Sequence, residues 1–304
     1  MQRQLQSYEV LLRRAECNIQ KLTSLQSTYH TQLAGFNGEK RVLFELKEIH
    51  FPHSVIHNFF AKNQFGNTVQ IDIIFICAHF VMILEVKNIN GRIDFDDNRR
   101  QLIRTRLDGQ QESFMNPVDQ VKRHQHYVES LLVQGSQFIP VESAIVIANS
   151  STLIGRISSE VPVFNVSGLR SKILELSKKY AHVSFNMRHV LGILKSQNLV
   201  QHFTLPVIDF PIREGVLCLR CGERMVFISH GFKCTKCNCW DVDNDALKKT
   251  LSDYKILYGN EITNAKFRQF TGIQNRTTAY KYLSKLRLPY RGNNRGRVYL
   301  LNKL

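Results

Sequence analysis

The chain has 304 residues, enough for one medium domain and one or two small modules. Hydrophobic residues make up 43% of it, which excludes a disordered protein. The net charge is +16, and residues 246–304 carry 13 lysines and arginines against two acidic residues. This excess predicts a partner with negative charge, either the phosphate backbone of a nucleic acid or an anionic membrane surface.

Three features bear on location. The first 20 residues are polar and lack the apolar segment of a secretory signal. The longest apolar run, residues 73–84, is well short of the roughly 20 residues that cross a bilayer. Five of the seven cysteines fall between positions 218 and 239, which is typical of a metal site rather than of disulfides. We therefore expect a cytoplasmic protein that does not enter a membrane.

Residues 1–34 are predicted to form an N-terminal helix, because leucine and isoleucine recur among polar neighbours. This helix is also a candidate surface for a homodimer. Gly35 and Gly38 are expected to interrupt it, and a second helix follows over residues 38–49.

Strand patterns dominate the next part of the chain, at residues 53–60, 68–77, 80–89 and 100–107. A turn-rich piece over 108–117 leads into a helix. Further elements are then expected in this order: a helix at 117–132, strands at 141–150 and 161–167, and helices near 168–180 and 185–198. This order indicates an α/β fold, with a mixed sheet flanked by helices.

Two acidic residues are expected to face each other inside this sheet. A two-residue turn at Ala78–His79 joins the strands 68–77 and 80–89. In that register Asp72 lies across from Glu85 on one face, because side chains alternate along a strand. Opposed like charges destabilise a sheet, and burial raises a carboxyl pKa. A divalent cation between the two removes the conflict, and oxygen ligands suit Mg²⁺ or Mn²⁺.

Other polar residues are expected near this pair. Lys87 shares the face of Glu85, where its ammonium group is suited to orient or deprotonate a water or to stabilise a phosphoryl charge. Glu39 is a candidate further ligand or base. Gln120 and His124, four apart on one helical face, are candidates to contact a substrate phosphate or to support the site.

A structural interpretation competes with the catalytic one. Asp72 then belongs to an edge strand, and Glu85 with Lys87 forms a solvated pair near a strand end. The apolar residues that flank all three positions favour the catalytic interpretation.

Three stretches resemble the nuclease-related domain (NERD) family: GEKRVLFEL, TVQIDIIFICAHFVMILEVKNINGRI and NPVDQVKRH. The resemblance covers about residues 35–150, and the family is similar to the PD-(D/E)xK restriction-endonuclease-like superfamily. It implies a mixed sheet flanked by helices and Mg²⁺-dependent hydrolysis of phosphodiester bonds by a metal-activated water. The implied site is Asp72, Glu85, Lys87, Glu39 and Gln120, with Asp72, Glu85 and Glu39 as metal ligands. Asp72 follows Ile71, whereas a proline is common there in the superfamily.

Four cysteines are spaced as ligands of one zinc ion. Cys218 and Cys221 form one CxxC pair, Cys234 and Cys237 form another, and 12 residues separate the pairs. Four thiolates close a tetrahedral shell and leave no position for a reacting water, so the predicted Zn²⁺ is structural. So short a segment does not fold without its metal. It resembles a zinc ribbon, with Cys239 or His230 as alternative ligands.

The basic end of the chain resembles a winged helix-turn-helix. Two short helices are expected on either side of a turn at residues 271–273, followed by a basic hairpin. The predicted core residues are Ala265, Phe267, Phe270, Ile273, Ala279, Leu283 and Leu286. The predicted DNA contacts are Arg276, Thr277, Thr278, Lys281, Lys285, Arg291, Arg295 and Arg297. A basic pair of helices that binds protein is the alternative.

The sequence therefore predicts a metal-dependent nuclease that hydrolyses DNA and is targeted by C-terminal nucleic-acid-binding modules. The predicted parts are an N-terminal helix (1–34), a nuclease-like domain (35–205), a linker (206–215), a zinc ribbon (216–241) and a DNA-binding module (243–304). The expected cofactors are Mg²⁺ or Mn²⁺ and one structural Zn²⁺, and the expected partner is duplex DNA. A non-catalytic DNA-binding or regulatory protein on a nuclease fold, or a nuclease that acts on RNA, are the alternatives.

Overall fold

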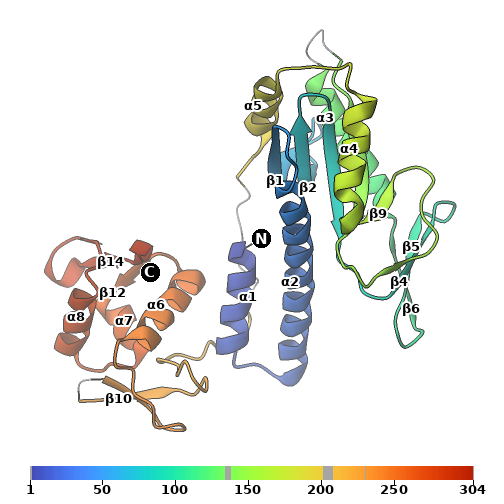
Figure 1. Ribbon diagram of the computed structural model, residues 1–304. Helices are drawn as coiled ribbons and strands as arrows, with labels where there is room; N and C mark the ends of the chain where they lie inside the picture. Colours follow the sequence, from blue (N-terminus) through green and yellow to red (C-terminus); the bar gives the residue numbers. More distant parts are fainter. Residues whose placement is uncertain (1, 134–137, 201–207, 230, 304) are drawn as a thin grey trace. The chain divides into compact units, whose positions relative to one another are not determined.

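The computed structural model describes residues 2–133, 138–200, 208–229 and 231–303, without the side chains of residues 2, 3, 295 and 303. The first residues of the predicted linker, 206 and 207, and His230 lie outside this part. The chain divides into two compact units, residues 33–202 and residues 1–32 with 203–304. Figure 1 shows the elements of both units. None of the described helices is long and apolar enough to span a bilayer.

The N-terminal part forms two helices whose boundary differs from the predicted one. α1 covers Gln2–Arg14, and α2 runs without interruption over Ile19–Lys47. The break between the helices covers residues 15–18. The Asn18 side-chain oxygen accepts a hydrogen bond from the Lys21 N–H at 3.0 Å and so caps the start of α2. The expected interruption at Gly35 and Gly38 is therefore wrong.

Gly38 serves close packing instead. A Cβ at this position would lie 2.8 Å from the Cβ of Asn88 and 3.3 Å from that of Ala148. A Cβ at Gly35 would meet nothing within 4 Å. The glycine thus lets α2 approach the chain that leaves the sheet, and the next residue, Glu39, is buried there.

Residues 33–202 are built on a five-stranded mixed sheet, as predicted. Its order is β1-β2-β3-β7-β9, with β1–β2 and β2–β3 antiparallel and β3–β7 and β7–β9 parallel. The strands are β1 (His53–Lys62), β2 (Thr68–Cys77), β3 (Val81–Lys87), β7 (Val141–Ile147) and β9 (Val163–Asn165).

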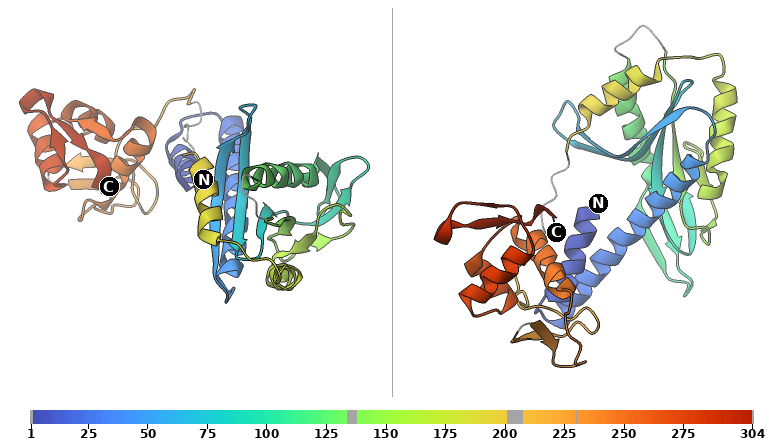
Figure 2. Two further views of the ribbon diagram at one scale, coloured as in Figure 1. Left: turned by 90° about the horizontal axis from the view of Figure 1, so that it is seen from above. Right: turned by 60° about the vertical axis from the view of Figure 1, so that its left-hand side comes forward.

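Helices cover both faces of this sheet (Figures 1 and 2). α3 (Pro117–Leu132) and α5 (Met187–Gln197) pack on the face that carries Ile74 and Ile83. α2 and α4 (Leu169–Lys179) pack on the face that carries Phe75 and Leu84. Because both faces are covered, β2 and β3 read as nearly continuous apolar runs, and the few polar residues in them stand out.

A second sheet has the order β6-β5-β4-β8. Its strands are β4 (Arg92–Asp96), β5 (Gln101–Thr105), β6 (Gln111–Met115) and β8 (Leu153–Ile154). The strand predicted over 100–107 is confirmed as β5. The prediction of a turn-rich piece over 108–117 is wrong in part, because residues 111–115 form β6. The residues of β6 are mostly exposed, so the sequence lacks the alternation of a half-buried strand.

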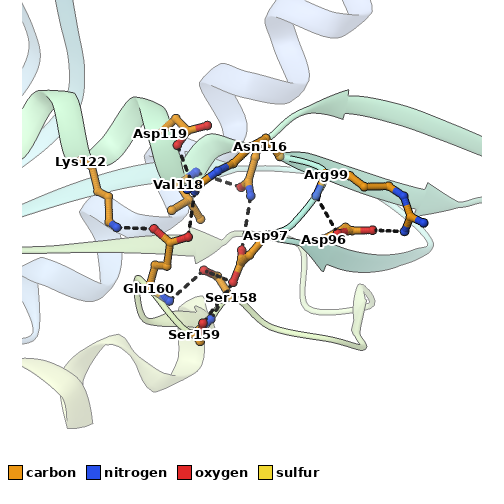
Figure 3. A network of polar contacts seen from close by, with 11 residues as sticks. Asp96, Asp97, Arg99, Asn116, Val118, Asp119, Lys122, Ser158, Ser159 and Glu160 are labelled. Carbon is orange, nitrogen blue, oxygen red and sulfur yellow. Dashed lines mark hydrogen bonds and ion pairs between the residues drawn. The ribbon is translucent and has the colours of Figure 1, made fainter.

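A polar network fixes the start of α3 (Figure 3). The side chain of Asn116 accepts a hydrogen bond from the Val118 N–H at 3.1 Å and donates one to Asp97 at 3.4 Å. Asp97 also accepts from the Ser158 hydroxyl at 3.1 Å and the Ser159 N–H at 3.0 Å. These bonds cap the helix and hold its first turns, which carry Gln120.

The other unit has a single hydrophobic core, to which α1, the cysteine segment and the C-terminal helices all contribute. Its helices are α6 (Asp245–Tyr258), α7 (Asn264–Thr271) and α8 (Arg276–Lys285). Its strands are β10 (Met225–Ile228), β11 (Gly231–Cys234), β12 (Glu261–Thr263), β13 (Tyr290–Arg291) and β14 (Val298–Leu300). The last three form a sheet of order β12-β14-β13.

Most of the core predicted around the turn at 271–273 is confirmed. Gly272, with φ of +79°, ends α7, and the Asn275 side chain caps α8. The buried members of the predicted core are Phe267, Phe270, Ile273, Ala279 and Leu283, and Leu286 is half-buried. Ala265 was predicted wrongly, because it lies on the exposed side of the first turn of α7.

Arg14 joins α1 to this core. Its side chain is fully buried and bonds Asp253 of α6 at 2.7 Å. The same guanidinium donates to the carbonyl oxygens of Arg213 and Gly215 at 3.0 and 3.1 Å. A buried ion pair of this kind requires that every donor is satisfied, so α1 is an integral part of the unit.

Candidate active site

The predicted register of the central hairpin is confirmed. Ile73 pairs with Leu84 and Ile76 with Val81, and the Cys77 N–H donates to the Phe80 carbonyl across the two-residue turn. The next position along this register sets Asp72 beside Glu85. β2 lies between β1 and β3, so the interpretation of Asp72 as an edge-strand residue is wrong.

The sheet opens locally around Asp72. Pairing of β2 with β3 stops at Ile73 and Leu84, and pairing with β1 skips Asn58. Asn58 has φ of +54°, a left-handed conformation that is rare within a strand. In place of a ladder bond, the Asp72 carboxylate accepts the Val86 N–H at 2.8 Å. Backbone outliers of this kind cluster at functional sites.

Glu85 lies at the centre of the site. It is only 2% exposed, and its Oε1 accepts a hydrogen bond from the Lys87 ammonium at 2.7 Å. Its other oxygen, Oε2, is buried without a hydrogen-bond partner. His124 Nδ1, on α3, is also buried without a partner and lies 3.9 Å from that oxygen. Buried polar atoms without partners are rare, so this pair indicates space for a ligand that bridges them.

Burial makes the charged forms of this site costly. Desolvation and the charge of Glu85 raise the pKa of Asp72 to about 7. Desolvation also raises the pKa of Glu85, although Lys87 opposes the shift. Desolvation lowers the pKa of His124 to about 4, so its imidazole is neutral at pH 7. The site thus combines carboxyl groups whose negative charges a cation would stabilise with a neutral imidazole nitrogen that is able to bind a metal ion.

The two remaining predicted residues also reach this site. Glu39, on α2, is 4% exposed, and its charge raises the pKa of both Asp72 and Glu85. Gln120, on α3, lies close enough to Glu85 to oppose the rise of its pKa that desolvation causes. The fold thus brings the other four predicted catalytic residues together around Glu85.

Sequence reasoning missed His57, on β1. Its Nε2 lies 2.6 Å from Glu39 Oε2, and the Asn58 side chain lies 3.0 Å from the same nitrogen. A sequence signal for this part of β1 was available. Lys62 and Thr68 pair across a short loop, and extending that register sets Asn58, the neighbour of His57, beside Asp72. His57 therefore fixes the orientation of the Glu39 carboxylate.

The donor atoms of the site fit a divalent cation of the Mg²⁺ or Mn²⁺ kind. Asp72, Glu85 and Glu39 offer carboxylate oxygens, and Glu85 Oε2 and His124 Nδ1 have no partners. Among the described residues, however, these ligand atoms do not form a set of three within 4.8 Å of one another. Mg²⁺ is usually held by one or two carboxylates with waters and substrate phosphates, so such a closed set is not required.

The predicted zinc ligands do form a closed set. The Sγ atoms of Cys218, Cys221, Cys234 and Cys237 all lie within 4.8 Å of one another. Contacts within the set measure 3.4–3.6 Å, against about 3.8 Å in a tetrahedral shell with a Zn–S distance of about 2.3 Å. This four-cysteine cluster is able to hold a metal ion such as zinc.

Cys239 lies beside this cluster. Its Sγ is 3.2 Å from that of Cys218 and 3.3 Å from that of Cys237. The Cys239 N–H lowers the pKa of Cys237 to about 6, whereas a hydrogen bond with Cys218 raises the pKa of Cys239 to about 12. Cys237, and not Cys239, belongs to the set of four sulfur atoms that lie within 4.8 Å of one another. The other alternative ligand, His230, lies outside the described residues.

The predicted DNA contacts fall on α8 and the C-terminal strands. Arg276, Thr277, Lys281 and Lys285 are exposed on α8, and Thr278 is half-buried. Arg291 is exposed and pairs with Glu261 at 2.7 Å. Arg297 is half-buried between aromatic rings, and the side chain of Arg295 is outside the described part.

Comparison with known protein families agrees with the geometry of the site. Residues 34–148 match the family model of the nuclease-related domain (NERD), almost the span expected from the sequence. The chain therefore contains a nuclease-related domain, and all five predicted catalytic residues fall within it. Comparisons with curated proteins and with solved structures give no match.

Proposed function

We propose that the chain is a metal-dependent nuclease of the PD-(D/E)xK type that hydrolyses DNA phosphodiester bonds. The observation that carries this proposal is the buried Glu85, bonded to Lys87 and set beside Asp72 where the sheet opens. A buried Glu85 and a half-buried Asp72 next to a lysine make their charged forms costly, and such a cost is typical of functional sites.

Each residue has a role in the proposed reaction. Asp72, Glu85 and Glu39 hold Mg²⁺ or Mn²⁺, which supplies a Lewis acid that acidifies water and neutralises phosphate charge. Lys87, whose side chain is 28% exposed, orients the attacking water or stabilises the charge that develops on the phosphoryl oxygens. Gln120 lies close to Glu85 and is suited to hold its carboxylate or a substrate phosphate in place.

The C-terminal unit is proposed to bind duplex DNA. The chain order α6-β12-α7-α8-β13-β14, with a three-stranded sheet, supports a winged helix-turn-helix in which α8 is the recognition helix. The cysteine cluster supports a zinc ribbon with a structural Zn²⁺. Because phosphate contacts release counterions, affinity for DNA falls steeply as salt rises.

The test is cleavage of supercoiled and linear DNA by the zinc-loaded protein, with and without Mg²⁺ or Mn²⁺. The wild type cleaves only with added metal. Glu85→Gln and Lys87→Ala each reduce the rate about 100-fold or more, because removal of one electrostatic stabiliser costs about that factor.

Asp108→Asn is the matched control, since Asp108 is an exposed loop carboxylate. DNA binding without cleavage in any sample would favour the non-catalytic alternative. Cleavage that persists in excess EDTA would exclude the metal mechanism. A parallel competition among duplex DNA, single strands and structured RNA defines the substrate.

A further inference from the structure

A pocket of about 520 Å³ lies between the first turn of α8, the start of α7 and the chain around β14. Two arginines, two tyrosines and two asparagines contribute to its wall: Arg276, Arg297, Tyr280, Tyr299, Asn264 and Asn294. No acidic residue is among the described residues that line it. The pocket is therefore positively charged, and its volume is within the range of about 300–1,000 Å³ typical of small-molecule sites.

Arg297 is held in place by aromatic rings. Its guanidinium lies 4.1 Å from the ring centroid of Tyr290 and 5.8 Å from that of Tyr280. The nearby hydroxyl groups of Tyr299 and Tyr280 raise the pKa of its guanidinium. Among the described residues it forms no ion pair with a carboxylate. A fixed guanidinium with no acidic partner is suited to bind a phosphate.

Two buried polar atoms of the pocket residues lack a well-formed hydrogen bond. The Tyr299 side chain is only 3% exposed, and its hydroxyl approaches Arg297 without completing a bond of good geometry. Arg297 Nε is also buried without a partner. Both residues line the pocket, so a bound acceptor would satisfy donors that the protein itself leaves unpaired.

The first turn of α8 adds further donors. The Asn275 side chain accepts the Thr278 N–H at 2.9 Å, and the Asn275 carbonyl accepts the Ala279 N–H at 3.0 Å. The amides of Arg276 and Thr277, at the start of this ten-residue helix, have no intrahelical acceptor. The positive end of the helix dipole favours an anion at this position.

We propose that this pocket binds one phosphate-bearing nucleotide. Arg297, Arg276 and the start of α8 hold the phosphate, and the Tyr280 ring lies against the nucleoside. The volume suits a whole nucleotide better than a phosphate alone. The inference rests on the proposed binding of DNA by this unit. A terminal nucleotide of DNA, an internal backbone phosphate and a free mononucleotide share this chemistry, and the experiment distinguishes them.

The test measures calorimetric binding of adenosine 5′-monophosphate and inorganic phosphate to the zinc-loaded full chain, without Mg²⁺ or Mn²⁺. The nucleotide binds more tightly than phosphate. Arg297→Lys and Arg276→Ala each weaken it about tenfold or more, because each removes charge-assisted hydrogen bonds. Tyr299→Phe, which deletes only the hydroxyl, weakens it several-fold and serves where an arginine variant fails to fold.

Lys266→Ala is the matched control, since Lys266 is an exposed cation of α7 that does not line the pocket. Competition by a linear 5′-phosphorylated duplex, but not by its dephosphorylated form or a closed circle, identifies a strand end. Equal competition by the circle identifies a backbone phosphate, and competition by neither identifies a free nucleotide.

The proposal is overturned if Arg297→Lys, Arg276→Ala and Tyr299→Phe all bind the nucleotide as Lys266→Ala does, or if the wild type does not bind it. This failure is separable from failure of the nuclease. Cleavage that depends on Glu85 would stand without the pocket, and nucleotide binding by a chain that cleaves nothing would stand without the nuclease.

Discussion

The Glu85 carboxyl group is buried and that of Asp72 is half-buried, and both have raised pKa values. A raised carboxyl pKa means that the folded state binds its proton more tightly than the unfolded chain does. The metal-free protein therefore loses stability as pH rises from about 4 through the pKa of Asp72, about 7.

Asp72→Asn should remove this loss. Asparagine is neutral at every pH and keeps an oxygen that accepts the Val86 N–H. Without Mg²⁺ or Mn²⁺, we expect the variant to melt at a higher temperature than the wild type at pH 8, and the difference to become small near pH 4, where the Asp72 carboxyl group begins to be protonated in the unfolded chain as well. Thermal melts at both pH values test this. An equal difference at both pH values would contradict a raised pKa of Asp72 in the folded protein.

Residue-level prediction succeeded where the signal was local. Strand alternation and a two-residue turn were sufficient to predict the β2–β3 register, whose next position sets Asp72 beside Glu85. The approach of Glu39 from α2 depends on helix–sheet packing, which alternation does not encode, so Glu39 was a candidate ligand without a predicted position. The His57–Glu39 contact was missed because the β1–β2 register was not extended to Asn58.

At the scale of elements, α2 shows that glycine in a helical pattern can have either of two structural roles. Glycine in a helical pattern indicates an interruption, which was the prediction for Gly35 and Gly38. It also permits close approach, which is its role at Gly38. Only the tertiary contacts with Asn88 and Ala148 distinguish the two, so the sequence alone was not sufficient.

Gly38→Ala and Gly35→Ala form a matched pair. Both gain helix propensity, so Gly35→Ala should stabilise the protein by about 0.5–1 kcal/mol. Gly38→Ala adds a contact of 2.8 Å to Asn88 and should be less stable than Gly35→Ala by about 1–3 kcal/mol. Urea denaturation measures the difference, and equal stability of the two variants would contradict the packing role.

At the scale of the whole molecule, the chain divides differently from its predicted linear parts. Residues 1–32 join residues 203–304 in one unit, and Val10 and Leu11 are buried in that core. Sequence patterns identify elements but not which distant elements share a core, so this association was not predicted. A homodimer through the N-terminal helix stays a prediction, which light scattering tests.

Asp253→Asn should destabilise only this unit. It leaves the buried Arg14 without its counter-ion, and breaking a buried pair costs about 3–5 kcal/mol. Calorimetry should show one transition lowered and the transition of residues 33–202 unchanged. Asp209→Asn, which removes an exposed pair with Lys21, is the control and should cost about 0–1 kcal/mol. A uniform shift of all transitions would contradict two separate units.

The central claim is that the buried carboxyl groups around Glu85 hold a divalent cation. The most direct measurement is Mn²⁺ binding, followed by electron paramagnetic resonance, to zinc-saturated wild type, Glu85→Gln and Asp108→Asn at pH 8. We expect wild type and Asp108→Asn to bind Mn²⁺ alike and Glu85→Gln to bind it about 10–100-fold more weakly. Equal affinity in all three proteins would show that Glu85 does not hold the metal, and would contradict the account.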